Sequence, residues 1–356
     1  MRDLKNPVIA VVGATGAVGT RLLSIMEQRN FPLGSLVPFA SERSLGSLIK
    51  FRNKQYPCQV LKDGCFQGVD IAFFDCSDEI SKIWALPAAQ AGAWVVDNSA
   101  VFRLDKDIPL LVPEINGAEI NSRLKGPHHP RTKILSGPNC STVQLVMALK
   151  PIQDRWGLKR VVVSTYQSVS GAGRAAMDEA QDQTRNVLEG KPIRPVAFAH
   201  QIAFNCIPQI GGFKSDGYTS EESKIIQECR KILGLPELKI TATAVRVPSL
   251  ICHCESVNIE CERPFSLPDV RAALSSFSGI VVIDEPQDLS YPLPLVEAGC
   301  NFPQATDQDP VYVGRIRIDE SAPNALNLWV VSDNLRKGAA LNAIQIGEGL
   351  IGCLGA

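Results

Sequence analysis

The chain has 356 residues, of which 45% are hydrophobic and 21% charged, and its formal net charge is -1. This length allows two domains with separate cores, and the near-neutral charge gives no basic surface for nucleic acid or an anionic membrane. No apolar run reaches the ~18 residues that a membrane span requires, and the start of the sequence lacks the apolar core of a signal peptide. The eleven cysteines show no framework-like spacing. We therefore expect a cytoplasmic protein with reduced thiols.

The first predicted elements are a buried strand over residues 8–12 and a helix around residues 22–26, joined by a glycine-rich turn. Three glycines stand three positions apart in this turn. In a strand, turn and helix that bind a dinucleotide, the first glycine makes the tight turn and the second lets the backbone approach the pyrophosphate. The third lets the helix pack on the strand. The predicted cofactor-binding residues of the turn are Gly13, Thr15, Gly16, Ala17 and Val18.

The type of cofactor is indicated one strand later, in residues 36–44. An NAD-specific site would place an acidic residue here to accept a hydrogen bond from the ribose 2′-hydroxyl. This chain instead has Arg43 between Ser41 and Ser44, which suits a 2′-phosphate. The segment therefore predicts NADP(H). The alternative is a solvated turn, because Glu42 dilutes the positive charge.

Strands alternate with helices up to about residue 134, which predicts a parallel, doubly wound sheet. The apolar runs 69–74 and 94–97 suit buried parallel strands. A last helical segment, residues 338–350, is expected to return to this part of the chain. We therefore predict a Rossmann-type first domain over residues 1–135 together with residues 334–356.

Cys140 stands between the strand-breaking pair Gly137 and Pro138 and a helix-patterned run over residues 143–149. Asn139 and Ser141 are typical helix-capping residues, and the free N–H groups of a first helical turn favour a thiolate. Cys140 is therefore the candidate nucleophile. Its alternative is an inert buried thiol.

His253 is the candidate acid/base for Cys140, since it heads a predicted strand over residues 253–261. The alternative is a structural histidine. Cys252 and Cys254 flank it, but in an extended strand the histidine points away from both. No second Cys/His pair stands at ligand spacing, so we predict no metal site.

The pattern changes after Cys140 to long strands and amphipathic helices. This change predicts a second, α+β domain over residues 136–333, built on a large mixed or antiparallel sheet. Residues 284–310 read as a long irregular loop. The predicted strands are 160–167, 240–247, 253–261, 311–318 and 325–331, and the helices are 175–188, 220–233 and 267–277.

Several ordered motifs together resemble the aspartate-β-semialdehyde dehydrogenase family over nearly the whole chain. The resemblance implies a Rossmann-type NADP-binding domain and an α+β catalytic and dimerisation domain with a large mixed sheet, as in glyceraldehyde-3-phosphate dehydrogenase-like enzymes. It is carried by residues 13–19, Val96-Asp97-Asn98-Ser99 with Phe102-Arg103, Pro138-Asn139-Cys140-Ser141-Thr142, residues 164–167 with 169–173, Ile202-Ala203-Phe204-Asn205, Glu221-Glu222-Ser223-Lys224, Val245-Arg246-Val247-Pro248 leading to His253, and residues 331–335.

The resemblance also implies an activity, the NADPH-dependent reductive dephosphorylation of L-4-aspartyl phosphate to L-aspartate 4-semialdehyde and phosphate, in lysine, threonine and methionine biosynthesis. It further implies a homodimer formed through the second domain, or a tetramer. The implied roles are a thioester-forming nucleophile for Cys140, an acid/base for His253, substrate orientation for Gln167, binding of the α-carboxylate for Arg246 and of the amino group for Glu221, phosphate binding for Arg103 and Lys224 with help from Asn139, and further NADP(H) contacts for Ser170, Gly171 and Asn334.

Other readings remain open. An N-acetyl-γ-glutamyl-phosphate reductase or a glyceraldehyde-3-phosphate dehydrogenase-like enzyme also uses a cysteine, and a non-catalytic paralogue would use none of this chemistry. Glu221 favours a substrate with a free ammonium group over an N-acetyl amide. Cys254 stands where the family has a serine, so an oxidation-sensitive thiol near the site is a further expectation.

Overall fold

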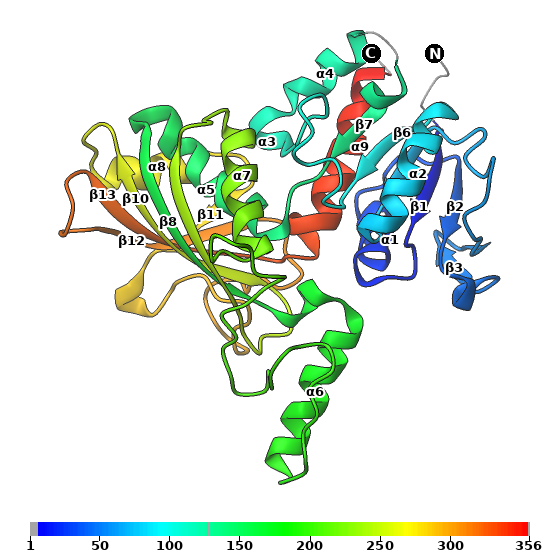
Figure 1. The fold of residues 1–356 in the computed structure, drawn as a ribbon. Coiled ribbons are helices and arrows are strands. Elements are labelled where there is room, and N and C mark those ends of the chain that lie inside the picture. The colour runs from blue at the N-terminus through cyan, green and yellow to red at the C-terminus, as the bar shows by residue number, and fades with distance from the viewer. Residues whose placement is uncertain (1–5, 127–128, 355–356) are drawn as a thin grey trace. The chain divides into compact units, whose positions relative to one another are not determined.

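The computed structural model describes residues 6–126 and 129–354. The described residues form two compact units, the first made of residues 6–126, 129–139 and 339–354 and the second of residues 140–338 (Figure 1). Among the described residues, no helix is both long and apolar enough to cross a membrane.

A five-stranded parallel sheet forms the centre of the first unit, in the order β2-β1-β5-β6-β7. The chain leaves β1 on one side for β2 and later returns on the other side as β5, so the topology reverses at β1. In such sheets ligands bind at the carboxyl ends of the strands beside this reversal. The strands are β1 (Val8–Val12), β2 (Ser35–Phe39), β5 (Ile71–Phe74), β6 (Trp94–Asp97) and β7 (Ile134–Ser136), and a small hairpin that was not predicted adds β3 (Leu48–Phe51) and β4 (Lys54–Pro57).

Helices cover both faces of this sheet, and each face has its own apolar core. Helix α9 (Leu341–Leu354) packs with α1 (Ala17–Gln28), α3 (Pro113–Asn116) and α4 (Ala118–Lys125). Helix α2 (Asp78–Gln90) packs on β5, β6 and β7. The last helix differs from its predicted bounds, because a π-helical turn over Arg336–Ala340 precedes α9.

The second unit is built on a six-stranded mixed sheet in the order β11-β12-β13-β10-β8-β9. The pairs β8/β9 and β11/β12 are parallel, and the other neighbours are antiparallel. The fold class predicted from the sequence, a Rossmann-type domain followed by a large mixed sheet, is therefore confirmed. The strands are β8 (Leu158–Gln167), β9 (Lys239–Arg246), β10 (His253–Cys261), β11 (Ile280–Val282), β12 (Val311–Ile318) and β13 (Ala325–Ser332).

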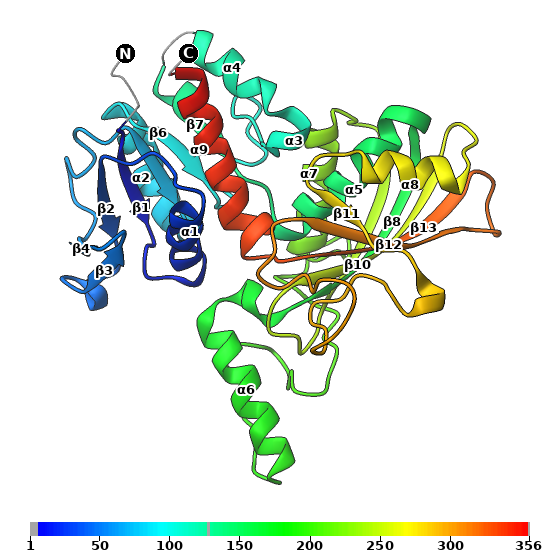
Figure 2. The same cartoon turned by 180° about the vertical axis from the view of Figure 1, so that it is seen from behind.

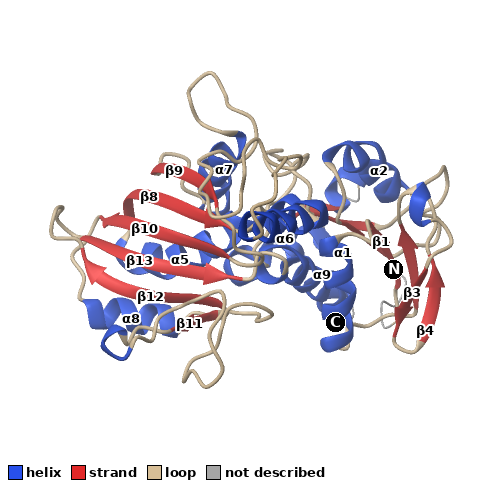
Figure 3. Ribbon diagram, turned by 90° about the horizontal axis from the view of Figure 1, so that it is seen from below, coloured by secondary structure: helices blue, strands red, loops and turns tan. Residues whose placement is uncertain are grey.

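Three helices pack against this sheet. Helix α5 (Cys140–Trp156) contacts β8, β10, β12 and β13, and it lies beside α7 (Ser220–Leu233), which packs on β9, and α8 (Leu267–Ser275), which packs on β11 and β12 (Figure 3). Helix α6 (Arg174–Leu188) projects away from the rest of the unit (Figure 2).

One row of polar side chains crosses four neighbouring strands of the mixed sheet. Arg246 pairs with Gln167, Gln167 with His253, and His253 with Ser332, each at the end of its strand. Paired residues of adjacent strands present their side chains to the same face. The register of the sheet therefore gathers side chains that lie far apart in the sequence.

Candidate active site

Cys140 is the first residue of α5, so its thiol lies at the amino end of a helix. The N–H groups of that first turn stabilise negative charge. The expectation for Ser141 as a capping residue is wrong, because Ser141 lies inside the first turn and is fully buried. Gly338 leaves room for the cysteine, since a Cβ at Gly338 would lie 3.0 Å from the Cβ of Cys140.

Cys140 Sγ lies 3.2 Å from His253 Nε2. The other ring nitrogen, Nδ1, accepts a hydrogen bond from the backbone N–H of Ser168 at 3.1 Å. An imidazole whose Nδ1 accepts carries its proton on Nε2, so the histidine presents an N–H to the sulfur. Burial, and next the charge of Arg246, lower the pKa of His253 to about 3. The ring is therefore neutral at physiological pH.

Arg246 supplies the positive charge of the site. It ends β9, it is buried, and its Nη1 donates to the backbone carbonyl of Ser168 at 2.6 Å. Burial lowers the pKa of Arg246, while the charges of Cys140 and Glu221 raise it. Because His253 is neutral, the counter-charge for a Cys140 thiolate comes from this guanidinium rather than from an imidazolium.

Gln167, Glu221 and Lys224 form a connected group beside Arg246. Gln167 Nε2 donates to Glu221 Oε1 at 3.1 Å, and Lys224 Nζ lies 3.8 Å from Glu221 Oε2. Glu221 and Lys224 stand on the first turns of α7, whose start is fixed by a capping box between Thr219 and Glu222. Glu222 also accepts the backbone N–H of Ala244 at 2.9 Å, which ties the start of α7 to β9.

Ser170, Gly171 and Asn334 lie around His253. Asn334 Nδ2 donates to Ser170 Oγ at 3.0 Å, and Asn334 Oδ1 accepts the backbone N–H of Cys252 at 3.0 Å. A Cβ at Gly171 would lie 3.1 Å from Arg246 Nη1 and 3.3 Å from His253 Nε2, so the glycine keeps the space over both groups open.

The glycine-rich turn of the first unit has the geometry of an anion-binding turn. Gly13 has a φ of +89°, and a Cβ there would collide with the carbonyl oxygen of Asp75. A Cβ at Gly19 would likewise collide with the carbonyl oxygen of Gly13, so the helix packs closely on the turn. Helix α1 has no side-chain cap and no acidic residue in its first turn, which suits a phosphate.

The remaining predicted site residues of the first unit occupy separate places in it. Arg43 lies with Ser41 and Ser44 in an exposed turn after β2. Arg103 is buried and its Nη2 donates to the carbonyl of Asn98 at 2.6 Å. Asn139 is buried and directly precedes α5.

Two cysteines near His253 are not reactive candidates. Burial raises the pKa of the Cys254 thiol to about 12, and that of Cys252 still further. Cys254 packs with Cys252 in a small apolar cluster on the face of the sheet opposite His253. The expectation of an oxidation-sensitive thiol at Cys254 is therefore wrong. The described residues contain no group of three His, Cys, Asp or Glu side chains that could hold a metal ion.

Ser168 belongs to this site although no sequence motif predicted it. Its contribution comes mainly from the backbone, whose N–H orients His253 and whose carbonyl holds Arg246. Only its position directly after Gln167 could have indicated that Ser168 belongs to the site. The second unit thus brings together Cys140, Gln167, Ser168, Glu221, Lys224, Arg246 and His253.

A Rossmann-type unit with an anion-binding turn, followed by a unit in which a cysteine contacts a histidine, is the architecture of a dinucleotide-dependent oxidoreductase. Two family models match the chain, the semialdehyde dehydrogenase NAD-binding domain over residues 8–123 and the semialdehyde dehydrogenase dimerisation domain over residues 149–337. The chain belongs to the semialdehyde dehydrogenase family.

Individual relatives agree over almost the full length. The aspartate-semialdehyde dehydrogenase of Aquifex aeolicus is 46% identical over 346 residues, which are 96% of this chain and 97% of that protein. The crystal structure of aspartate semialdehyde dehydrogenase II from Vibrio cholerae, complexed with ASA, matches with a TM-score of 0.88 and 42% identity over 97% of this chain and 98% of that one. The Candida albicans enzyme, solved with NADP, matches with a TM-score of 0.72 and 25% identity, covering 97% and 98% of the two chains.

Proposed function

We propose that this protein is an aspartate-semialdehyde dehydrogenase that reduces L-4-aspartyl phosphate to L-aspartate 4-semialdehyde and phosphate with NADPH. The main structural support for this activity is the 3.2 Å contact between Cys140 Sγ and His253 Nε2, next to the charge of Arg246. The names and near-complete coverage of the relatives support the assignment. The eleven free cysteines are typical of a protein of the reducing cytoplasm.

The charges around the site suit an aspartyl substrate. Arg246 offers a guanidinium for the α-carboxylate, and Glu221 offers a carboxylate for the α-ammonium group. Gln167, which donates to Glu221, helps to orient the substrate. An N-acetylated substrate would leave the buried carboxylate of Glu221 facing an uncharged amide, so the N-acetyl-γ-glutamyl alternative is disfavoured.

Acylation begins when the Cys140 thiolate attacks the carbonyl carbon of the acyl phosphate. A C–S bond forms, the C–O bond to the phosphoryl group breaks, and a thioester remains on Cys140. The N–H groups of the first turn of α5 stabilise the oxyanion of the tetrahedral intermediate. Lys224 and Arg103 are the proposed phosphate-binding residues, with Asn139 assisting.

Reduction converts the thioester to the aldehyde. NADPH, when bound, would supply the hydride for the thioester carbon. The N–H of His253 Nε2 and the amino end of α5 would stabilise the resulting oxyanion. When the C–S bond breaks, the aldehyde leaves and Cys140 returns to its thiolate. The overall reaction consumes one proton, which the departing phosphate takes up.

We infer the cofactor-binding residues from the geometry of the first unit and from the sequence motifs. The glycine-rich turn, with Gly13, Thr15, Gly16, Ala17 and Val18, would hold the pyrophosphate on the amino end of α1. Arg43, Ser41 and Ser44 would hold the 2′-phosphate, and we propose NADP over NAD on this basis. Ser170, Gly171 and Asn334 complete the proposed set around His253.

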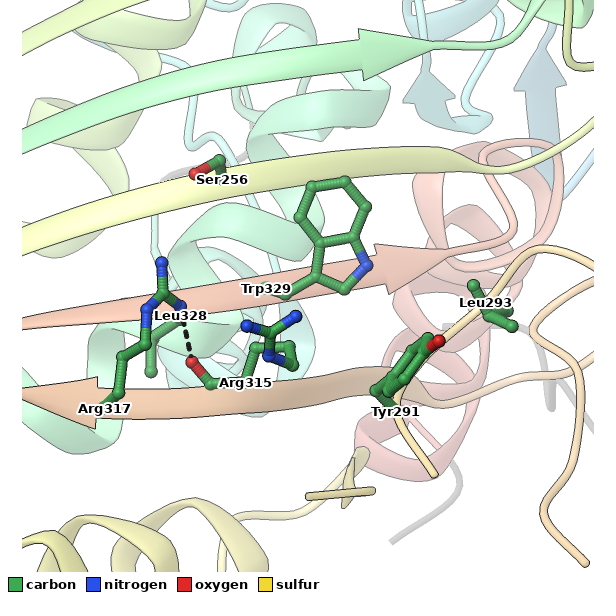
Figure 4. A pocket seen from close by; sticks show the side chains of 7 residues that line it. All are labelled: Ser256, Tyr291, Leu293, Arg315, Arg317, Leu328 and Trp329. Carbon is green, nitrogen blue, oxygen red and sulfur yellow. Dashed lines mark hydrogen bonds between the residues drawn. The ribbon is translucent and has the colours of Figure 1, made fainter. Parts of the chain in front are cut away.

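The face of the mixed sheet opposite α5, α7 and α8, here called the outer face, supports a homodimer. Trp329, Arg315 and Arg317 lie on this face, and a pocket of about 280 Å³ opens between Trp329, Tyr291 and the two arginines (Figure 4). The rings of Tyr166 and Trp329 are 5.6 Å apart. Tyr, Trp and Arg are the residue types enriched in protein interfaces, and the family model over residues 149–337 is a dimerisation domain. We propose that a second copy of the chain covers this face.

Sedimentation of a Tyr166→Arg variant tests the dimer. We expect it to dissociate, whereas Ile83→Arg, on the exposed face of α2, should sediment like the wild type. A wild-type monomer, or a Tyr166→Arg dimer as stable as the wild type, would show that this face is not the interface.

The activity is tested in the reverse direction, by following NADPH formation from aspartate semialdehyde and NADP with and without inorganic phosphate. N-acetylglutamate semialdehyde runs in parallel. Phosphate-dependent reduction of NADP with the aspartyl substrate alone supports the proposal. Activity with only the acetylated substrate would assign the chain to the alternative reductase, and none with either would indicate a non-catalytic paralogue.

A further inference from the structure

A second buried pair lies on the same two elements as Cys140 and His253. Gln144 follows Cys140 by one turn of α5, and Glu255 is the next residue after His253 on the same face of β10. Both side chains are fully buried, and α5 packs on β10. This pair therefore lies one layer deeper in the unit than the catalytic pair.

The surroundings of Glu255 favour the neutral carboxyl over the charged carboxylate. Burial raises the pKa of Glu255 well above its ordinary range, and only the amide of Gln144 acts to lower it. Thr165 and Val330 flank Glu255 on the neighbouring strands. Burial raises the pKa of two nearby thiols, Cys229 on α7 and Cys254 on β10, and a charge on Glu255 would raise both further.

Gln144 and Glu255 have complementary hydrogen-bonding groups that other described residues leave unused. Neither carboxyl oxygen of Glu255 and neither amide atom of Gln144 has a partner of ordinary hydrogen-bond geometry within the described part of the chain. A protonated carboxyl can donate its O–H to the amide oxygen and accept the amide N–H in return. A small closure of the pair would satisfy both groups, which burial otherwise penalises.

Neutrality of Glu255 also matters for the nucleophile. A buried carboxylate two residues from His253, on the strand that faces Cys140, would repel a thiolate. A neutral carboxyl leaves the counter-charge of Arg246 undiminished. It also links the helix that carries the cysteine to the strand that carries the histidine.

We propose that Glu255 is a positioning residue, which in its protonated form pairs with Gln144, ties the first turns of α5 to β10, and so sets the separation of Cys140 Sγ from His253 Nε2. The proposal rests on the proposed function only in taking Cys140 as the nucleophile. Its test needs neither substrate nor cofactor, so its failure is distinguishable from a wrong substrate assignment.

The test measures the rate at which iodoacetamide alkylates Cys140 as a function of pH, read by peptide mass spectrometry. Exposed Cys206 serves as the reference thiol within each sample. The variants are Glu255→Gln, Glu255→Leu, Gln144→Leu and the double leucine variant. Val257→Ala is the matched control, because Val257 is fully buried and is the next residue on the same face of β10.

Moving His253 away from Cys140 weakens one hydrogen bond to the thiolate, so we expect each single leucine variant to slow Cys140 alkylation about two- to tenfold, a loss no larger than that of His253→Asn. The double variant should be no slower than either single variant, because both remove the same contact. Glu255→Gln and Val257→Ala should keep the wild-type pH profile. A wild-type profile in Glu255→Leu, or an equal change in Val257→Ala, would overturn the positioning role.

The protonation state is tested by unfolding with urea across pH. A native pKa above the unfolded value of about 4.3 means that the folded state holds a proton that the unfolded state has released, so wild-type stability falls as pH rises through this window. Glu255→Gln lacks this titration and should lose less stability toward high pH. Parallel curves for the two proteins, or faster Cys140 alkylation in Glu255→Gln, would show that Glu255 is charged and would overturn the proposal.

Discussion

Ser168 donates its backbone N–H to His253 Nδ1 at 3.1 Å. This single contact decides which nitrogen of the histidine carries the proton, and therefore what faces the sulfur of Cys140. The carbonyl of the same residue holds the Arg246 guanidinium at 2.6 Å. The peptide groups around one residue thus orient both the neutral acid/base and the cation of the site.

Replacing His253 with asparagine should separate turnover from thiolate formation. We expect kcat to fall by about 10²–10⁴-fold, the usual contribution of a positioned acid/base. Alkylation of Cys140 should fall much less, because Arg246 and the helix terminus remain to stabilise the thiolate. Equal losses of turnover and alkylation, measured on the same preparation, would mean that an imidazolium is the counter-charge after all.

Arg246→Lys should weaken substrate binding despite keeping the charge. A lysine lacks the planar fork that a carboxylate accepts, so we expect KM for aspartate semialdehyde to rise about tenfold or more. Arg155→Lys, at the exposed end of α5, is the matched control in the same steady-state assay. An unchanged KM in Arg246→Lys would remove Arg246 from the substrate site.

Glu221→Gln should reduce selectivity for a free amino group. The amide keeps the size of the side chain but loses the charge, and hydrogen bonds to charged groups contribute about 1.5–3 kcal/mol, so KM should rise roughly tenfold to a hundredfold. The comparison is Glu237→Gln, an exposed residue beyond α7. If kcat/KM for the aspartyl substrate is the same in both variants, the ammonium group is bound elsewhere.

Arg43→Ala should lower the preference for NADPH over NADH. Loss of a charged contact to the 2′-phosphate should weaken NADPH binding about tenfold or more and leave NADH nearly unaffected. Glu42→Ala, a change at the adjacent exposed position, should not lower the preference. Fluorescence titration with both cofactors measures this, and an undiminished preference in Arg43→Ala contradicts the assignment of NADP(H) to this turn.

His253 should also make the fold sensitive to acid. Its pKa is about 3 in the folded protein and about 6.5 when unfolded, so between these values the unfolded state binds the extra proton. Its contribution to stability is complete above about pH 6.5 and falls by up to about 1.4 kcal/mol per pH unit below it. Urea unfolding of His253→Asn should show a shallower loss toward low pH, and parallel curves would contradict a neutral buried His253.

Local patterns in the sequence predicted the parts of this molecule that depend on neighbouring residues. The spacing of its glycines predicted the turn from Gly13 to Gly19. The position of Cys140 between a strand-breaking pair and a helix predicted that it is the candidate nucleophile. The alternation of strands and helices predicted the fold class. The strand ending at Arg246 was predicted within one residue of its bounds.

The other features of the site depend on strand register and burial, which a local sequence pattern does not predict. Gln167, Arg246 and His253 meet because three strands pair at their ends. The depressed pKa of His253 follows mainly from its complete burial. The pairing that we propose for Gln144 and Glu255 follows from the packing of α5 on β10. The π-helical turn before α9 leaves no periodic signal that distinguishes it from an α-helix.

Thioester formation on Cys140 is measured most directly by mass spectrometry of the protein after incubation with aspartate semialdehyde and NADP in the absence of phosphate. We expect an aspartyl adduct that maps to the Cys140 peptide, is discharged by adding phosphate, and is missing in Cys140→Ser. An adduct on a different cysteine, or turnover by Cys140→Ser at a rate near that of the wild type, would contradict thioester catalysis at Cys140.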